Sequence, residues 1–362
     1  MHLQSRPEYT FHSSSDILTA NFSPFHPSLV IGGTYSGQVL LWDTRSRSAL
    51  PVQKTPLTGA SAGGHTHPIY SVEVVGTQNA NNIISCSTDG VVCGWTVDML
   101  SQPQEYLELT VPPPSKTEDI SPLCMAFPPS DPTSFLIGTE EGTMYPCHRY
   151  DRAGAKAGVD TRVRYRGHAA PVMSVNFHSA RGPMDLSDLV LTSSLDWTVK
   201  LWKVRPPSSA STAAGTSSNF PSIIPGSSTS NIQEISPVIE FSREDVIYDA
   251  RWSPQRPGVF ALVDGLGNVE VWDLLVDTEI PVAKATPLAN KKVVGLAAAY
   301  APKSLNKVAW DEKEGKRLAV GGASGMVTVF EVGAGLSGEG GVKGEEWAGM
   351  KKLIGKMERG GR

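Results

Sequence analysis

The chain has few cysteines, few charged residues and no long apolar run. Its 362 residues include four cysteines, Cys86, Cys93, Cys124 and Cys147, and none of them form the CxxC spacing of a zinc or redox site. We therefore expect reduced thiols and no bound metal. The N-terminus lacks the apolar core of a signal peptide, and no stretch approaches the roughly 20 apolar residues of a membrane span. These absences predict an intracellular, cytoplasmic protein without membrane insertion.

The charge balance and the motifs give no sign of nucleic-acid binding or catalysis. There are 32 Lys and Arg against 36 Asp and Glu, mixed along the chain, and the net charge is −4. A nucleic-acid-binding protein normally has a basic stripe instead. His65 and His67 have no further ligand at metal-site spacing, and the glycines at 265 and 267 do not extend to a dinucleotide fingerprint. We expect no catalytic residue, no cofactor and no enzyme activity.

Short β-rich runs separated by turn residues repeat six times. Each repeat has a tight turn followed five residues later by a large residue. The six runs are LVIGGTYSGQVLLW from Leu29, IISCSTDGVVCGW from Ile83, FLIGTEEGTMYPC from Phe135, LVLTSSLDWTVKLW from Leu189, VFALVDGLGNVEVW from Val259 and RLAVGGASGMVTVF from Arg317. The turn residue is glycine in five of them and Trp197 in the fourth. Glycine suits a hairpin turn because such turns need positive φ.

Each repeat supplies further strands on both sides of this hairpin. Alternating apolar runs precede the hairpins, at 17–22, 69–74, 123–127, 172–177, 246–252 and 305–310, and extended runs follow five of them, starting at Pro51, Glu105, Arg162, Pro237 and Pro281. Four antiparallel strands repeated at this period predict the blades of an all-β propeller.

Several strand ends resemble the WD-repeat family. Leu41-Trp42-Asp43 and Val271-Trp272-Asp273 are near its consensus, and Gly64-His65 and Gly167-His168 match the dipeptide that opens a repeat. The resemblance implies a buried, hydrogen-bonded structural tetrad in the fourth repeat: His168, a strand hydroxyl such as that of Ser194, Asp196 and Trp202. Cys147 and Phe330 stand where Trp is expected in the third and sixth repeats, so complete tetrads are not expected there.

Longer stretches resemble the C-terminal propeller of cytoplasmic dynein intermediate chains. They include FHPSLVIGGTYSGQVLLWDTRS from Phe25, DLVLTSSLDWTVKLW from Asp188 and YDARWSPQRPGVFALVDGLGNVEVWDLLVDTEIP from Tyr248. The similarity covers nearly the whole chain apart from insertions. It implies a non-catalytic subunit of the microtubule motor that docks on the dynein heavy chain and meets other dynein subunits indirectly. The family's N-terminal region, which contacts dynactin and light chains, has no counterpart here, so we do not expect those contacts.

Two other hypotheses remain open. A WD-repeat scaffold in another assembly, such as a ubiquitin-ligase receptor or a trafficking complex, would have the same architecture. A propeller enzyme would need convergent polar residues in its channel, and the sequence nominates none. Propellers usually bind through loops on one face, and anchors are often aromatic or Arg. The loop residues Phe25, His26, Arg45, Arg47, Arg251 and Arg256 are therefore our candidates for partner binding.

Composition divides the rest of the chain. The propeller is expected over 1–332, with a disordered, Ser/Thr/Pro-rich insertion at 206–237, followed by a glycine-rich linker at 333–344. Residues 345–362 predict a helix with Trp347, Met350, Ile354 and Met357 on one face. We expect this helix to fold onto its own propeller, and the alternative is docking on a partner.

The number of blades is a separate question. The sixth repeat has three clear strands, and residues 7–11 form one lone extended stretch before the first repeat. We expect a seven-bladed propeller that lacks most of its first blade. In the alternative, the N-terminal stretch supplies the missing outer strand of the sixth repeat and closes a six-bladed ring.

Overall fold

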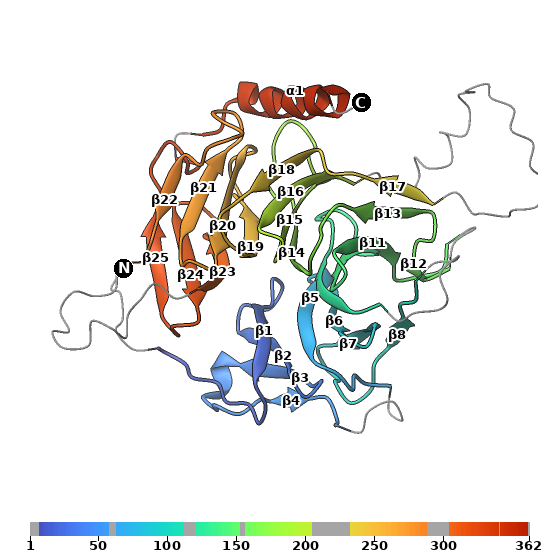
Figure 1. The fold of residues 1–362 in the computed structure, drawn as a ribbon. Coiled ribbons are helices and arrows are strands. Elements are labelled where there is room, and N and C mark those ends of the chain that lie inside the picture. Colours follow the sequence, from blue (N-terminus) through green and yellow to red (C-terminus); the bar gives the residue numbers. More distant parts are fainter. Residues whose placement is uncertain are drawn as a thin grey trace, which may run out of the picture. The chain divides into compact units, whose positions relative to one another are not determined.

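The chain folds into two compact units made almost entirely of antiparallel sheets (Figure 1). The computed structural model describes residues 7–57, 63–111, 120–152, 156–204, 232–287, 304–339 and 341–360. The first unit consists of residues 1–127, 131–140 and 144–164, and the second of residues 128–130, 141–143 and 165–362. The predicted fold class, an all-β propeller built from six repeat units with one short C-terminal helix, is confirmed.

The first unit holds the sheets of the first three repeats. The first sheet contains β1 (Ile17–Phe22), β2 (Leu29–Thr34), β3 (Val39–Asp43) and β4 (Gln53–Lys54), with the short helix η1 (Thr44–Ser46) after β3. The second contains β5 (Ile69–Thr77), β6 (Ala80–Ser87), β7 (Val91–Thr96) and β8 (Glu105–Glu108). The third contains β9 (Pro122–Ala126), β10 (Ser134–Thr139), β11 (Thr143–His148), β12 (Gly158–Val159) and β13 (Val163–Arg166), whereas β17 (Gln233–Ile235) belongs to the second unit.

The second unit holds the last three sheets and the helix. They are β14 (Val172–Phe177), β15 (Leu189–Ser194), β16 (Thr198–Lys203) and β18 (Ile239–Ser242); then β19 (Ile247–Trp252), β20 (Val259–Asp264), β21 (Val269–Asp273) and β22 (Ala283–Ala285); then β23 (Leu305–Trp310), β24 (Arg317–Gly322) and β25 (Val327–Glu331). Helix α1 spans Gly344–Gly360. Of the insertion expected at 206–237, residues 206–231 lie outside the described residues, whereas β17 lies within its last part.

Side chains at a bulge join inner strand β5 to β9 in the first unit and inner strand β14 to β19 in the second. The pairing of β5 with β6 shifts register just before Ser71, and the pairing of β14 with β15 shifts just before Ser174. The Ser71 hydroxyl accepts the Met125 N–H of β9 at 3.2 Å, and the Ser174 hydroxyl accepts the Ala250 N–H of β19 at 3.2 Å. These amides lie on strand edges without a ladder partner. The bulge therefore satisfies buried donors that would otherwise destabilise the fold.

The hairpin turns explain the repeated glycine. At Gly142 φ is +84°, and a Cβ there would lie 2.6 Å from the His168 carbonyl oxygen. Trp197 holds the same place in the fourth sheet with φ of +70°. A residue with a Cβ is strained by about 1–2 kcal/mol in this left-handed conformation.

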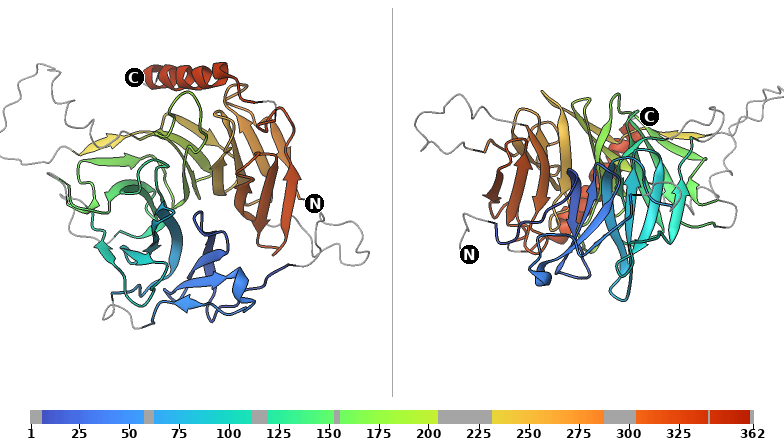
Figure 2. Two further views of the ribbon diagram at one scale, coloured as in Figure 1. Left: turned by 180° about the vertical axis from the view of Figure 1, so that it is seen from behind. Right: turned by 90° about the horizontal axis from the view of Figure 1, so that it is seen from below.

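Helix α1 packs onto the second unit, as the sequence predicted. Figure 1 and Figure 2 show it running along the outside of the β14–β18 and β19–β22 sheets. Trp347, Met350 and Ile354 are buried in a cluster with Leu189, Trp252 and Leu274. The Trp347 ring lies against Gly182 in the loop between β14 and β15. The helix thus covers apolar residues of its own propeller and is not a free arm.

At the N-terminal end of the described residues, an aromatic side chain covers the first sheet. The Phe11 ring lies 5.7 Å from the Trp42 ring, and the His12 N–H bonds to the Ala49 carbonyl. Tyr165 of strand β13 also places its ring near a strand tryptophan, 6.0 Å from the Trp202 ring, although that pair is edge-on and the Phe11–Trp42 pair is tilted. The segment that contains Phe11 therefore contacts Trp42 much as strand β13 contacts Trp202. The expected number of blades stays a prediction.

The first prediction concerns the packing of α1 against the loop between β14 and β15. Gly182→Ala would place a methyl group 2.2 Å from the rigid Trp347 ring, so the ring or the loop must move. Such overpacking costs roughly 1–3 kcal/mol. We expect a lower free energy of unfolding in urea and faster proteolysis at α1. Gly333→Ala is the matched control, because no atom lies within 4 Å of that added Cβ. Equal stability of the two variants would contradict the packing described.

The second prediction concerns pH. Burial between Trp252 and Trp347 lowers the pKa of His178 from 6.5 to about 4. Between these two pKa values the unfolded chain binds a proton that the folded chain does not, so stability falls as pH falls. His178→Gln keeps an N–H for the Pro257 carbonyl but cannot titrate. Between pH 7.5 and pH 5 we expect the wild type to lose about 2 kcal/mol more than this variant in urea unfolding. Parallel losses would show that His178 is not buried as a neutral ring.

Candidate interaction surfaces

The tetrad predicted in the fourth repeat is a continuous buried network. His168 Nδ1 bonds to Asp196 Oδ2 at 2.9 Å, and His168 Nε2 bonds to the Thr192 hydroxyl at 2.7 Å. The Trp202 Nε1–H donates to the same hydroxyl at 2.8 Å. Trp202 is fully buried. The chain of bonds therefore runs from the hairpin turn at Asp196 across the sheet to the third strand.

The hydroxyl in this network belongs to Thr192, which corrects the choice of Ser194. Both residues face the same side of β15 because they are two positions apart. Ser194 lies nearer the turn, where its hydroxyl donates to the Ala170 carbonyl and accepts the Asp196 N–H. Thr192 lies one step deeper, level with the His168 ring. The sequence could not separate two hydroxyls on one strand face.

The network fixes the charge states of its members. Burial lowers the pKa of His168, although Asp196 opposes this shift, so the imidazole is neutral at pH 7. Burial alone would raise the pKa of Asp196, but hydrogen bonds from His168 and Thr198 outweigh it and lower that pKa. An ionised carboxylate then accepts bonds from a neutral ring and from the Ala169 amide. All four groups are engaged with one another, which leaves no proton donor or nucleophile for a substrate.

A shorter version of the network occurs in the second repeat. His65 Nε2 bonds to the Ser85 hydroxyl at 2.6 Å, and Trp95 Nε1–H donates to that hydroxyl at 2.8 Å. Burial lowers the pKa of His65 to about 4. In the fifth repeat Trp272 donates instead to Glu270. In the third repeat the buried Cys147 supplies no indole donor, in line with the departure seen in the sequence.

The first group of predicted partner-binding residues gathers at one edge of the first sheet. Phe25 and His26 form the half-buried turn between β1 and β2, where the Ser23 hydroxyl accepts both of their amides. Arg45 and Arg47 follow β3, and the Thr44 N–H bonds to the Ser28 carbonyl of the first turn. Arg45 is exposed and pairs with Asp43 at 2.8 Å, and this pairing lowers the pKa of Asp43 to about 2. These four residues therefore share one accessible edge.

The second group, Arg251 and Arg256, has internal partners, and the prediction that Arg251 lies in a loop is wrong because this residue belongs to strand β19. Arg251 Nε lies 3.1 Å from Oδ1 of Asp249, a fully buried carboxylate. Arg256 donates to the Ser337 carbonyl and pairs with Glu346 of α1 at 3.4 Å. Both arginine side chains are therefore engaged by carboxylates of their own unit, and Arg256 also by a backbone carbonyl. Their part in partner binding stays a prediction.

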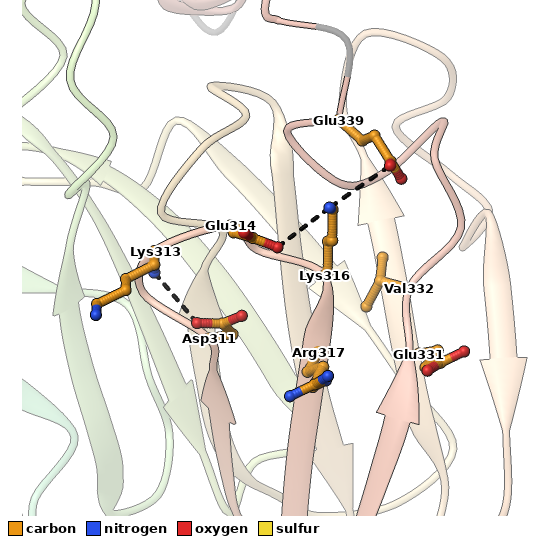
Figure 3. Close-up of a pocket in the computed structure, with 8 residues that line it drawn as sticks. All are labelled: Asp311, Lys313, Glu314, Lys316, Arg317, Glu331, Val332 and Glu339. Carbon is orange, nitrogen blue, oxygen red and sulfur yellow. Dashed lines mark hydrogen bonds and ion pairs between the residues drawn. The ribbon is translucent and has the colours of Figure 1, made fainter. Parts of the chain in front are cut away.

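A pocket of about 470 Å³ lies beside the sixth sheet (Figure 3). Its lining is almost entirely charged: Asp311, Lys313, Glu314, Lys316, Arg317, Glu331, Val332 and Glu339. Lys316 Nζ lies between Glu314 at 3.1 Å and Glu339 at 3.5 Å. The lining contains no histidine, cysteine or hydroxyl side chain. Carboxylates and amines can serve as acids, bases or nucleophiles, but Lys316, Glu314 and Glu339 are held in ion pairs with one another.

Among the described residues, no cluster of three or more His, Cys, Asp or Glu side chains could hold a metal ion. No helix in the part of the chain that the structure describes is long and apolar enough to cross a membrane. The indole of Trp197 is half exposed at a turn, although Trp197 was not predicted from the sequence as a surface residue. The feature of the sequence that could have indicated this exposed residue is a tryptophan at a position where the other five repeats have glycine.

The third prediction tests the network through its central hydroxyl. Thr192→Val keeps the shape but leaves the buried His168 and Trp202 nitrogens without that partner, which costs about 2–3 kcal/mol of unfolding free energy. Thr192→Ser keeps the hydroxyl and loses only a methyl group, at about 1 kcal/mol. Urea unfolding of both variants at pH 7.5 measures the difference. Equal destabilisation would mean that the hydroxyl does not carry the network.

Comparison with known proteins adds evidence for the family. Residues 160–203 match the model of the WD domain, G-beta repeat, a range that contains β13 to β16 and the network from His168 to Trp202. The chain is 36% identical over 335 residues to the cytoplasmic dynein 1 intermediate chain of Drosophila melanogaster. The alignment covers 92% of this chain and 43% of that protein, so the chain spans less than half of that relative. These matches confirm the resemblance found in the sequence. The chain is therefore a WD-repeat β-propeller protein, related over 92% of its length to a cytoplasmic dynein intermediate chain.

Proposed function

We propose that this chain is a non-catalytic subunit of cytoplasmic dynein whose propeller docks on the heavy-chain tail. It would help to assemble the motor for cargo transport, meet the other dynein subunits through the heavy chain, and be located with microtubules in the cytoplasm. The observation that carries the proposal is the 36% identity to a dynein intermediate chain over 92% of this chain. Similarity of that extent includes loops and outer strands as well as the repeat signature.

The arrangement of polar groups supports a binding role without catalysis. His168, Asp196 and Thr192 bond to one another inside the fourth sheet, and the second sheet uses His65 and Ser85 in the same way. The four cysteines are buried and form no disulfide, and burial raises the pKa of Cys86 and Cys147 well above the usual value. Such thiols are poor nucleophiles. The histidine, aspartate and cysteine side chains that often carry out chemistry are thus used for hydrogen bonding and packing inside single blades.

The edge that contains Phe25, His26, Arg45 and Arg47 is the proposed contact with the heavy chain. Arg45 is largely exposed, and Arg47 has a left-handed backbone with φ of +53°. An aromatic side chain beside two arginines has the composition of an interface anchor. An acidic surface on the heavy-chain tail would complement it, and such charge complementarity mainly speeds association.

The fourth prediction tests this contact. The whole chain is mixed with purified cytoplasmic dynein heavy-chain tail, and the dissociation constant is measured by biolayer interferometry. We expect wild-type binding and at least about tenfold weaker binding by Arg45→Glu/Arg47→Glu, equivalent to about 1.4 kcal/mol. The melting temperature should change little, because both side chains are at the surface.

Lys351→Glu/Lys352→Glu is the matched control. It makes the same charge change on exposed residues of α1. If the wild type fails to bind the heavy-chain tail, the dynein proposal is overturned. Co-purification from native cytosol with another assembly would then support the scaffold alternative. If the wild type binds and the Arg45/Arg47 variant binds equally well, this edge is excluded and the dynein role stands.

A further inference from the structure

Trp197 exposes a large aromatic side chain where the rest of the propeller uses glycine. It occupies the turn between β15 and β16 (Figure 1), with φ of +70° and 51% of its surface exposed. The five equivalent glycines have φ between +73° and +86°. A glycine here would be less strained and would expose less apolar surface. The turn itself therefore does not explain the indole.

Several hydrogen bonds hold this turn in place. Asp196 Oδ1 accepts the Thr198 N–H at 3.0 Å, and Oδ2 accepts the Ala169 N–H at 3.0 Å. The Trp197 carbonyl accepts the Arg243 N–H at 2.8 Å. The backbone under the indole is thus fixed by the network on one side and by the next loop on the other. A fixed backbone lowers the entropy lost when a partner binds.

The residues around Trp197 are apolar or acidic. The loop after Arg243 continues with the exposed Glu244 and with Asp245, and the Gly265 N–H bonds to the Val246 carbonyl of that loop. Leu266 follows and is 46% exposed. The Arg243 guanidinium is turned away, since it pairs with Glu270 at 2.9 Å and lies over the Trp272 ring.

The other flank has the same character. Gly142 lies against the carbonyls of His168 and Ala170, so the turn with the exposed Glu141 lies beside the loop of the exposed Ala169, whose N–H bonds to Asp196. We call this surface the turn ridge; it consists of Glu141, Ala169, Trp197, Glu244, Asp245 and Leu266. It combines an aromatic anchor with small apolar neighbours and a carboxylate on each side.

We propose that the turn ridge is a docking site for a basic, amphipathic protein segment, which places an arginine or lysine over the Trp197 ring. A guanidinium or ammonium is attracted to an indole face and to nearby carboxylates, and apolar side chains of the segment would cover Leu266 and Ala169. Phosphate-rich partners such as nucleic acids and anionic lipids would be repelled by Glu141, Glu244 and Asp245. The ridge lies at the hairpin-turn end of its sheets, whereas Arg251 lies in β19 and Arg256 in the turn after that strand. The ridge shares no residue with the edge at Phe25, His26, Arg45 and Arg47, so it is a further site beyond the proposed heavy-chain contact.

The fifth prediction uses a probe that does not depend on dynein. A fluorescein-labelled helical peptide of about 18 residues, with leucines on one face and arginines on the other, is titrated with the whole chain and followed by anisotropy. We expect Trp197→Gly to bind at least about tenfold more weakly than the wild type. Its melting temperature should be unchanged or higher, because glycine relieves the backbone strain. Glu244→Lys/Asp245→Lys should also bind more weakly and should remove most of the salt dependence.

Two controls make the result specific. Val276→Ala changes an exposed apolar residue after β21, at the other end of the fifth sheet, and should bind the peptide like the wild type. A peptide with glutamate in place of arginine should not bind the wild type. Equal affinity of Trp197→Gly and the wild type for the arginine peptide would overturn the site. Peptide binding that depends on Trp197 but is unaffected by the Glu244/Asp245 change would overturn the proposal that the partner is basic.

Discussion

The structure depends on how the free edges of its inner strands are satisfied. In a sheet of three or four strands, the inner strand has one edge without a neighbour, and its buried amides need acceptors. A bulge in the preceding inner strand turns a polar side chain toward that edge: Ser71 reaches Met125, Ser174 reaches Ala250, and Asp249 reaches Val308 at 3.2 Å. These bonds link one blade to the next within each unit. Asp249 is the most demanding case, because a fully buried carboxylate also requires the Arg251 cation.

Inside single blades, too, polar side chains are used for internal hydrogen bonds. His168 and Asp196 could act as an acid–base pair elsewhere, yet here they tie the hairpin turn to Thr192 and Trp202. Because the residues with chemical reactivity are used in this way, recognition falls to the turns and loops at the ends of the strands. The two surfaces argued above, at Arg45 and at Trp197, both rest on rigid turns. Arg45 lies in a short helix capped by Asp43, and Trp197 follows a carboxylate held by several donors.

Much of the fold could be predicted because the same pattern of turn and strand recurs six times, so the strands assigned in one repeat support those assigned in the others. Six hairpins with a turn and a large residue at a fixed offset gave the sheets and most strand ends, and α1 followed from the spacing of Trp347, Met350 and Ile354. The choice between Thr192 and Ser194 could not be made, since strand alternation puts both on one face and only depth in the sheet separates them. Arg256 was chosen as an exposed loop cation, but it pairs with Glu346, ninety residues later in the chain.

The sequence by itself therefore determined the class of fold, the order of the strands and the family resemblance, because these depend on local periodicity and on motifs read along the chain. The tertiary structure decided which polar groups are used internally and which remain available. Trp197 shows the reason. Its place at a hairpin turn was visible in the sequence, but its exposure and its fixed backbone depend on Ala169 and Arg243 from loops before and after its own sheet. Contacts between residues far apart in the chain are set by packing, which no local pattern specifies.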